Sequence, residues 1–155
     1  MGGYVYSYSE RQLLIYNFIK KIGPSPEAVL EVLFGLQTAN ALHRLKQSGY
    51  LQKTEVSGTD FWHQPNYGYF DAVEQETMAW FVVRLEEAGG KYEGEYGTSP
   101  KGNRFLLRYA PGCIHITDEE NRKFVTQLED LQRFKLAECL KWKTLKTLDK
   151  KWKGS

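Results

Sequence analysis

The sequence contains few cysteines and few histidines, which limits the metal and redox chemistry open to it. It has 2 cysteines, and Cys113 and Cys139 lie in different expected elements without the CxxC spacing of a zinc site. Both are therefore expected to be reduced thiols of a protein core rather than parts of a disulfide framework. Cys113 and His115 together provide too few ligands for zinc. We expect the protein to bind no metal and no cofactor.

Long apolar segments are also missing. No stretch approaches the roughly 18 consecutive apolar residues of a transmembrane helix, and the start, MGGYVYSYSE, lacks the basic and apolar regions of a signal peptide. Tyr6 occupies the position where N-myristoylation requires Ser or Thr. We therefore expect a cytoplasmic protein. Its hydrophobic fraction of 41% and aromatic fraction of 14% are those of a folded chain.

The usual catalytic motifs are absent as well. The sequence has no P-loop, no GxGxxG motif and no ordered Ser, His and Asp set, and its histidines fall in unrelated expected elements: His43, His63 and His115. Acidic residues from Asp71 onward could suggest a metal-dependent nuclease. Such a site needs an acid and a lysine two positions apart on one strand, and Glu93-Gly94-Glu95 offers no lysine. We expect a protein without enzymatic activity.

The formal net charge of +2 hides an uneven distribution. Residues 1–65 carry six basic and five acidic residues, and residues 66–120 carry five basic and ten acidic residues. Residues 121–155 carry ten basic and four acidic residues. The basic C-terminal end is therefore the part expected to contact polyanions, and the acidic middle is the part least expected to do so.

The first part of the chain predicts two helices. Ser9, with Gln12 three residues later, has the spacing of a capping box, and apolar residues follow at helical spacing. Ser25 as N-cap and Pro26 as first helical residue predict a second helix, which ends at Gly35. Both helices carry one apolar face, and that of the second helix is expected to face a core.

Residues 36–64, LQTANALHRLKQSGYLQKTEVSGTDFWHQ, predict a third helix followed by a hairpin. Leu42 and Leu45 form a narrow apolar stripe, and Gly49 stands where a helix stop belongs. Strands are expected at 50–56 and 60–64, joined by a turn at Ser57-Gly58-Thr59.

Three helices, a tight turn between the second and third, a Gly-Tyr-Leu segment and a hairpin, in this order, resemble the winged helix-turn-helix superfamily, including the reading heads of MarR-like and ArsR-like bacterial regulators. This resemblance covers residues 9–65 and implies that the third helix lies in the major groove of double-stranded DNA. Its polar face would then contact base edges, and lysines beside it would contact phosphates. The predicted DNA contacts of this region are Gln37, Asn40, His43, Arg44, Lys46, Gln47 and Lys53. The alternative is that this polar face is simply solvated.

The expected hairpin departs from the basic wings of this superfamily. Glu55 and Asp60 flank its turn, where wings that enter the minor groove carry Arg or Lys. Residues 1–65 also carry nearly balanced charge, whereas DNA-binding domains usually have a stronger basic footprint. Because winged helices also serve in protein docking, a docking module in a larger assembly is the alternative function, with Trp62 as the side chain expected to contact the partner.

The middle of the chain predicts one helix and a small sheet. Asp71 is the expected N-cap of a helix with an almost continuous apolar run, which Gly89-Gly90 ends. Strands are expected at 91–96, 104–109 and 113–117, in an antiparallel meander separated by turns that contain glycine and proline. In the order of its elements, this plan resembles the replication-relaxation type of proteins of plasmids and other mobile elements.

A long basic helix is expected at the C-terminal end. It would begin at Asp118 as N-cap and continue past residue 150, with residues 124–140 packing against a second subunit to form a homodimer. Its last third is rich in lysine, and three lysines are predicted to contact DNA phosphates: Lys143, Lys146 and Lys150. Plain solvation of this helix and binding to an anionic membrane are the alternatives, and its short apolar face argues against the membrane.

Together these patterns predict an α+β protein. It would have an N-terminal winged helix-turn-helix in residues 1–65, a helix and small antiparallel β-meander in residues 66–117, and a basic C-terminal helix in residues 118–155, a candidate dimerisation element. The predicted function is binding of double-stranded DNA, in transcriptional regulation or as an accessory factor in plasmid or phage DNA processing. A homodimer would match a palindromic operator, and a protein partner is the alternative to DNA.

Overall fold

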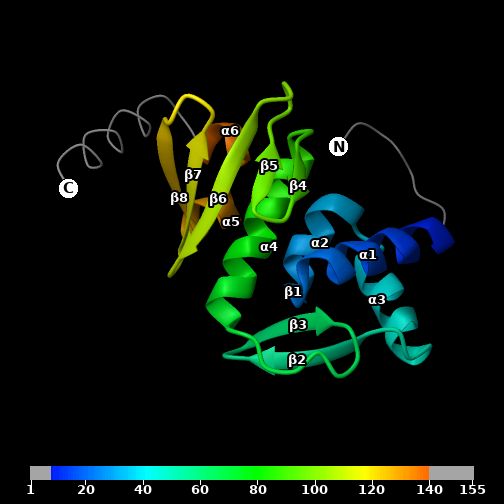
Figure 1. Cartoon of the computed structure of the whole chain (residues 1–155). Coiled ribbons are helices and arrows are strands. Elements are labelled where there is room, and N and C mark those ends of the chain that lie inside the picture. Colours follow the sequence, from blue (N-terminus) through cyan, green and yellow to red (C-terminus); the bar gives the residue numbers. More distant parts are fainter. Residues whose placement is uncertain (1–7, 140–155) are drawn as a thin grey trace. The chain divides into compact units, whose positions relative to one another are not determined.

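In the computed structural model, which describes residues 8–139, the chain is a mixed α+β protein. These residues contain six helices and two antiparallel sheets (Figure 1). The chain divides into two units, residues 1–75 and 76–155, each with its own sheet. Among the described residues, no helix combines the length and the apolar character that crossing a bilayer requires.

Three helices build the first unit: α1 (Tyr8–Ile22), α2 (Glu27–Phe34) and α3 (Thr38–Gln47). Apolar side chains recur on each helix every three or four residues, so each has one face that is removed from water. Ile15 of α1, Leu30 of α2 and Leu42 of α3 are fully buried and mark the centre of this core. The core therefore forms where the helical spacing of the sequence predicts it.

The predicted ends of the second and third helices are confirmed. Gly35 follows α2 with a φ of 78°, and Gly49 follows α3 and its C-cap Ser48 with a φ of 81°. Glycine adopts this left-handed conformation at little cost, so the chain can turn sharply at both points.

The first sheet has three strands, in the order β1-β3-β2: β1 (Ser25–Pro26), β2 (Gln52–Val56) and β3 (Thr59–His63). A hairpin forms where it is predicted, with Glu55 opposite Asp60 across β2 and β3. Its bounds differ, because β2 begins at Gln52 and not at residue 50, and Thr59 belongs to β3 and not to the turn. Ser57 and Gly58 form its two-residue connection and have φ values of 51° and 83°, as in a type I′ turn. This turn matches the twist of the strands and fixes their register.

Two predicted helix starts are wrong. Ser25 and Pro26 do not begin α2, because they form β1 and pair with β3. The Ser25 hydroxyl donates to the Gly23 carbonyl at 2.9 Å, and α2 has no side-chain cap. Ser9 lies inside α1, which already includes Tyr8. At Ser25, pairing with a distant strand satisfies the backbone and outweighs a local capping preference.

Most of α4 (Ala72–Glu87) belongs to the second unit, which is built around it. Its predicted start is confirmed, because Asp71 Oδ1 accepts the Glu74 backbone N–H at 2.9 Å, as an N-cap does. The consecutive residues Phe81, Val82 and Val83 are all fully buried, so α4 has no solvent face at this level. The apolar run in the sequence therefore marks a helix enclosed by other elements.

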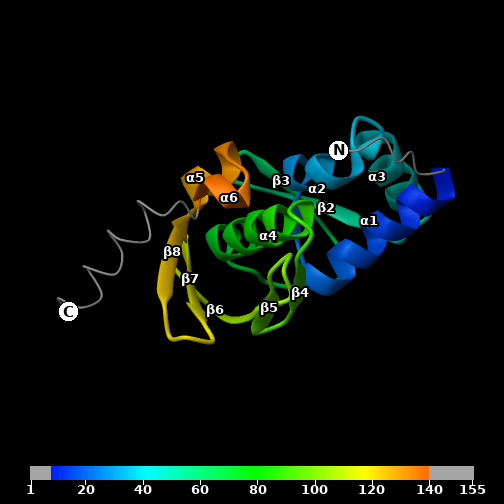
Figure 2. The ribbon, with the colours of Figure 1, turned by 90° about the horizontal axis from the view of Figure 1, so that it is seen from above.

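Five strands form the second sheet as a meander, each antiparallel to the next. They lie in an arc around α4, which occupies the concave side of the sheet (Figure 2). Phe81 of α4 contacts Phe105 of the sheet, with ring centres 6.4 Å apart. The strands are β4 (Lys91–Glu93), β5 (Tyr96–Thr98), β6 (Arg104–Ala110), β7 (Cys113–Asp118) and β8 (Lys123–Gln127).

The sequence prediction is wrong at two places in this sheet. Residues 91–96 are not one strand, because Gly94, with a φ of 82°, turns the chain between β4 and β5. Asp118 does not begin a helix. Its carboxylate accepts the backbone N–H groups of Glu120 and Arg122 at 3.0 and 2.8 Å, which closes a turn into β8. The same side chain that suits a helix start thus stabilises a hairpin connection instead.

The described residues after β8 form two short helices in place of the start of a long one: α5 (Leu128–Arg133) and α6 (Leu136–Cys139). Phe124 lies on β8, so residues 124–140 do not form one continuous dimerisation helix. Buried Arg84 of α4 fixes α5, because its Nε donates to the Leu131 carbonyl at 2.7 Å and its Nη2 to the Gln132 carbonyl at 3.2 Å. The rest of the predicted helix lies outside the described residues.

Candidate nucleic-acid interface

The side of α3 that faces away from the core carries the side chains that the sequence predicts as DNA contacts. Thr38, Ala41, Leu42 and Leu45 are buried and define the inner side of the helix. The predicted contacts on and just before this helix are all exposed: Gln37, Asn40, His43, Arg44, Lys46 and Gln47. The structure therefore brings these side chains together on the solvent side of one helix, which we call the α3 face.

Within the α3 face, amide and imidazole side chains form one ridge along the helix. Asn40, His43 and Gln47 are three and four positions apart, so their side chains stack along one line. Arg44 lies beside this ridge, one turn after Asn40. Asn40 Nδ2 donates to Gln37 Oε1 at 2.9 Å, which orients both amides. The ridge thus presents oriented donors and acceptors together with a guanidinium.

The turn before α3 holds the α3 face in position. Thr38 is buried, and its hydroxyl donates to the Gly35 carbonyl at 2.6 Å. The Gly35 N–H donates in turn to the Glu31 carbonyl at 2.9 Å. At the other end of α3, the Tyr50 N–H donates to the Leu45 carbonyl at 2.9 Å. Hydrogen bonds at both ends therefore supplement the shared core in fixing this helix.

Lys53, the remaining predicted contact of this unit, lies on β2 and not on the α3 face. Its Nζ is 3.8 Å from Asp60 Oδ2 and 5.5 Å from the centre of the Trp62 ring. The two ion-paired side chains are 39% and 46% exposed, so their attraction is weak. Even so, Asp60 offsets part of the charge that Lys53 could offer to a phosphate.

His63 supports the hairpin from inside. It is buried, and its Nε2 shares a hydrogen bond of 2.7 Å with the Thr54 hydroxyl, while its Nδ1 lies 2.8 Å from the Gln64 carbonyl. Trp62 Nε1 donates to Glu27 Oε1 at 3.2 Å, which ties β3 to α2. These polar side chains therefore have structural roles in the first unit.

Lys143, Lys146 and Lys150, the predicted phosphate contacts of the C-terminal end, lie outside residues 8–139. Comparison of the chain with protein-family models, curated proteins and solved structures finds no match. The functional argument therefore rests on the chemistry and placement of the described residues.

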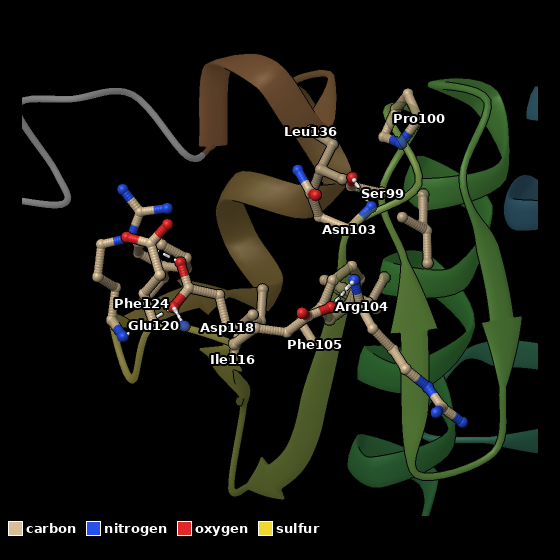
Figure 3. Close-up of a pocket in the computed structure, with 14 residues that line it drawn as sticks. Ser99, Pro100, Asn103, Arg104, Phe105, Ile116, Asp118, Glu120, Phe124 and Leu136 are labelled. Atoms are coloured by element: carbon tan, nitrogen blue, oxygen red, sulfur yellow. Dashed lines mark hydrogen bonds and ion pairs between the residues drawn. The ribbon is translucent and has the colours of Figure 1, made fainter.

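The second unit contains a cavity of about 530 Å³ that sequence patterns do not predict (Figure 3). Its lining includes Phe81 from α4, Phe105 and Ile116 from the sheet, and Leu136 from α6. Strand alternation in the sequence is enough to predict which residues of β6 and β7 point inward. It does not predict how far the sheet curves away from α4 and α6, and that curvature sets the volume.

The polar groups at the rim of this cavity have partners within the protein. Asp118 accepts the Arg122 Nε–H at 2.7 Å in addition to two backbone N–H groups, and Glu119 Oε1 accepts the Arg104 backbone N–H at 3.0 Å. These carboxylates hold the connection between β7 and β8 in shape. Within the part of the chain that the structure describes, no group of three or more His, Cys, Asp or Glu could hold a metal ion.

Proposed function

We propose that the first unit is a winged helix-turn-helix that binds double-stranded DNA through the α3 face, and that the protein acts without enzymatic activity. The observation that carries this proposal is the exposure of Asn40, Arg44 and Gln47 on one side of a helix whose other side is anchored in the core. The elements also follow one another in the order typical of that superfamily: two helices, a tight turn, a third helix and a hairpin.

The side chains of the α3 face suit the edges of base pairs in the major groove. Asn and Gln can each form two hydrogen bonds with adenine, and Arg can form two with guanine. Asn40, Gln47 and Arg44 would therefore give sequence preference. Lys46, on the flank of the helix, would contact a phosphate and add affinity without preference.

In this proposal the protein is a cytoplasmic homodimer. Two subunits related by a two-fold axis would each read one half of a palindromic site. Lysines of the C-terminal end would add salt-dependent affinity: Lys143, Lys146 and Lys150. Such a protein would serve in transcriptional regulation or as an accessory factor in plasmid or phage DNA processing.

The test is selection of a preferred duplex from a random pool, followed by fluorescence anisotropy with variants of the α3 face. Arg44→Ala and Asn40→Ala are each expected to weaken binding to the selected duplex by about 1 to 3 kcal/mol, because each removes a base contact. Asn17→Ala, at an exposed position of α1, is the matched control and should leave the affinity unchanged.

The proposal is tested by how much affinity each variant loses for the selected duplex and for a random duplex. Base contacts give discrimination, so both α3 variants should lose more affinity for the selected duplex than for a random one. If Arg44→Ala and Asn40→Ala bind the selected duplex as tightly as the unmodified chain, the α3 face does not read DNA and the proposal is wrong. Circular dichroism of each variant checks that its fold is intact.

Protein docking is a second candidate function for this unit. Glu55 and Asp60 lie opposite each other beside the hairpin turn, which makes its tip acidic, and Leu36 in the turn before α3 is 100% exposed. Trp62, the docking side chain suggested by the sequence, is buried instead. Docking is favoured if the chain fails to bind duplex DNA at low salt and an identified protein partner is lost in Leu36→Glu but kept in the Asn17→Ala control.

A further inference from the structure

The second sheet has two chemically different sides. Successive residues of a strand point to opposite sides of the sheet. Phe105 contacts α4, and the register places Leu107, Ile114 and Ile116 on the same side, facing the core of the unit. The residues between them lie on the opposite side, which we call the outer sheet face.

The outer sheet face is basic. The register places four basic residues and one acidic residue on it, all of them exposed: Lys91, Arg104, Arg108, Lys123 and Glu93. The cations come from the two outermost strands and from the central strand β6, so positive charge spans the width of the sheet. Arg104 and Arg108 are four positions apart on β6, about 13 Å along the strand.

Strand alternation places no other acidic residue of this part of the chain on the outer sheet face, but Asp118 and Glu119 line a hollow beside Tyr96 and Arg104. Three of the other acidic residues form the turn between β7 and β8, where Arg122 Nε lies 2.7 Å from Asp118 Oδ2 and 3.7 Å from Glu120 Oε2. The rest lie on α4, next to its start, or in the turn between β4 and β5: Asp71, Glu74, Glu76, Glu86, Glu87 and Glu95. Apart from Glu93, Asp118 and Glu119, the acidic residues of 66–120 therefore lie away from the outer sheet face.

An aromatic and an apolar side chain lie between these cations. Tyr96 and Leu106 are opposite each other on β5 and β6, and they are 38% and 47% exposed. The Arg104 guanidinium lies over the Tyr96 ring, 4.4 Å from its centre. The shallow hollow beside them, of about 280 Å³, runs toward Thr117 and is also lined by Asp118 and Glu119 at its β7–β8 end. The outer sheet face thus combines positive charge with flat surfaces on which another ring can stack.

We propose that the outer sheet face binds single-stranded nucleic acid, with Arg104, Arg108 and Lys123 contacting phosphates and Tyr96 stacking on a base. Proteins that bind single strands without sequence preference combine a basic track with aromatic side chains of this kind. The bases of a duplex are stacked on one another inside it, so they are not available to stack on Tyr96 or to contact Leu106. This surface shares no residue with the α3 face, and the proposal does not depend on duplex binding there.

The test uses the full chain and a fluorescein-labelled oligothymidine strand, with anisotropy measured at low and moderate salt. Arg108→Glu is expected to weaken strand binding about tenfold or more, because it replaces a phosphate contact by a repulsion. Tyr96→Ala should weaken it about tenfold through lost stacking, and Tyr96→Phe should keep most of the affinity. Lys101→Glu, at an exposed lysine in the loop before β6, controls for net charge alone.

Three results would overturn the proposal. The strand does not bind at low salt, or Lys101→Glu weakens binding as much as Arg108→Glu, or the outer-face variants weaken binding of a random duplex as much as binding of the strand. If Arg108→Glu unfolds the sheet, Arg108→Gln removes only the charge and gives the same comparison. If Arg108→Glu weakens strand binding and Arg44→Ala does not, the strand binds the outer sheet face and not the α3 face. This conclusion holds whether or not the chain also binds duplex DNA.

Discussion

Burial and a neighbouring cation act together on His115. This residue lies opposite Arg108 on the adjacent strand. Burial lowers its pKa, and the positive charge of Arg108 lowers the pKa further, so the imidazole is mainly neutral at pH 7. The outer sheet face therefore carries four cations at neutral pH and does not gain a fifth from this histidine.

Acid is expected to destabilise the protein through His115. The unfolded chain binds a proton at the ordinary pKa of 6.5, whereas the folded chain binds it only at lower pH. Between these values the unfolded state holds more protons, so the free energy of unfolding falls as the pH falls. Thermal unfolding at about pH 7.5 and 5.5 should show a smaller drop in melting temperature for His115→Gln than for the unmodified chain. His43→Gln, at an exposed histidine, is the control, and equal drops in both variants would contradict the prediction.

The exposure of side chains on α3 could be predicted from the sequence, but the partners of single residues could not. Helical spacing alone places Asn40 and Gln47 on the solvent side of α3, and the structure agrees. The pairing of Lys53 with Asp60 depends on strand register, and so does the place of Arg108 beside His115. In a hairpin the register is fixed by turn type and loop length, and the expected turn Ser57-Gly58-Thr59 is one residue longer than the Ser57-Gly58 connection of the structure.

At the scale of elements, the hairpin of the first unit depends on a strained turn. Ser57 has a φ of 51°, a left-handed conformation that costs most side chains about 1 kcal/mol. Asparagine adopts this conformation more readily, and Asn-Gly is a preferred type I′ pair. A single substitution in this turn is therefore expected to increase the stability of the folded chain.

Ser57→Asn is expected to stabilise the chain by up to about 1 kcal/mol, because it relieves this strain. Urea unfolding monitored by circular dichroism would measure the change. Ser48→Asn places the same residue at the end of α3, where φ is an ordinary −82°. That control should change stability little, and a gain of equal size there would show that turn conformation is not the cause.

Elements with strong start or end signals were predictable, and a strand that forms by pairing with its neighbour in place of a locally favoured helix was not. The ends of α2 and α3 follow from Gly35 and Gly49, and the start of α4 follows from Asp71. The helical spacing of Phe124 and Leu128 predicts a helix that includes residues 123–127. In the structure this segment is β8 and pairs with β7, and this pairing outweighs its local preference for a helix.

At the scale of the whole molecule, the net charge of a segment is a poor guide to its surfaces. Residues 66–120 carry ten acidic and five basic residues, which predicts little contact with polyanions. Folding nevertheless places Lys91, Arg104 and Arg108 from this segment on one side of a sheet. Because successive residues of a strand point to opposite sides, basic residues can lie together on one side of a sheet even when the net charge of the segment is negative.

The basic C-terminal end is expected to contribute to the salt dependence of DNA binding. Removing residues 140–155 deletes six lysines and one aspartate, while Leu136 and Cys139, which are buried in the second unit, are kept. Loss of the three predicted phosphate contacts should reduce the slope of log affinity against log salt concentration by about 3. Anisotropy with a random duplex at several salt concentrations would measure it. A variant with Lys143, Lys146 and Lys150 all changed to Gln should match the truncated chain, and an unchanged slope in both would exclude these contacts.

The two cysteines differ in what a thiol reagent can reach. Cys139 is buried, and this burial raises the pKa of its thiol, so it holds little of the reactive thiolate at neutral pH. Cys113 is half-buried at the start of β7, opposite Gln127 on β8, on the same side of the sheet as Arg108 and His115. A maleimide dye should therefore attach to Cys113 first, in the unmutated chain. The protein thus carries its own attachment point for a fluorophore at the edge of the outer sheet face, where a change in emission would report the arrival of a strand in real time.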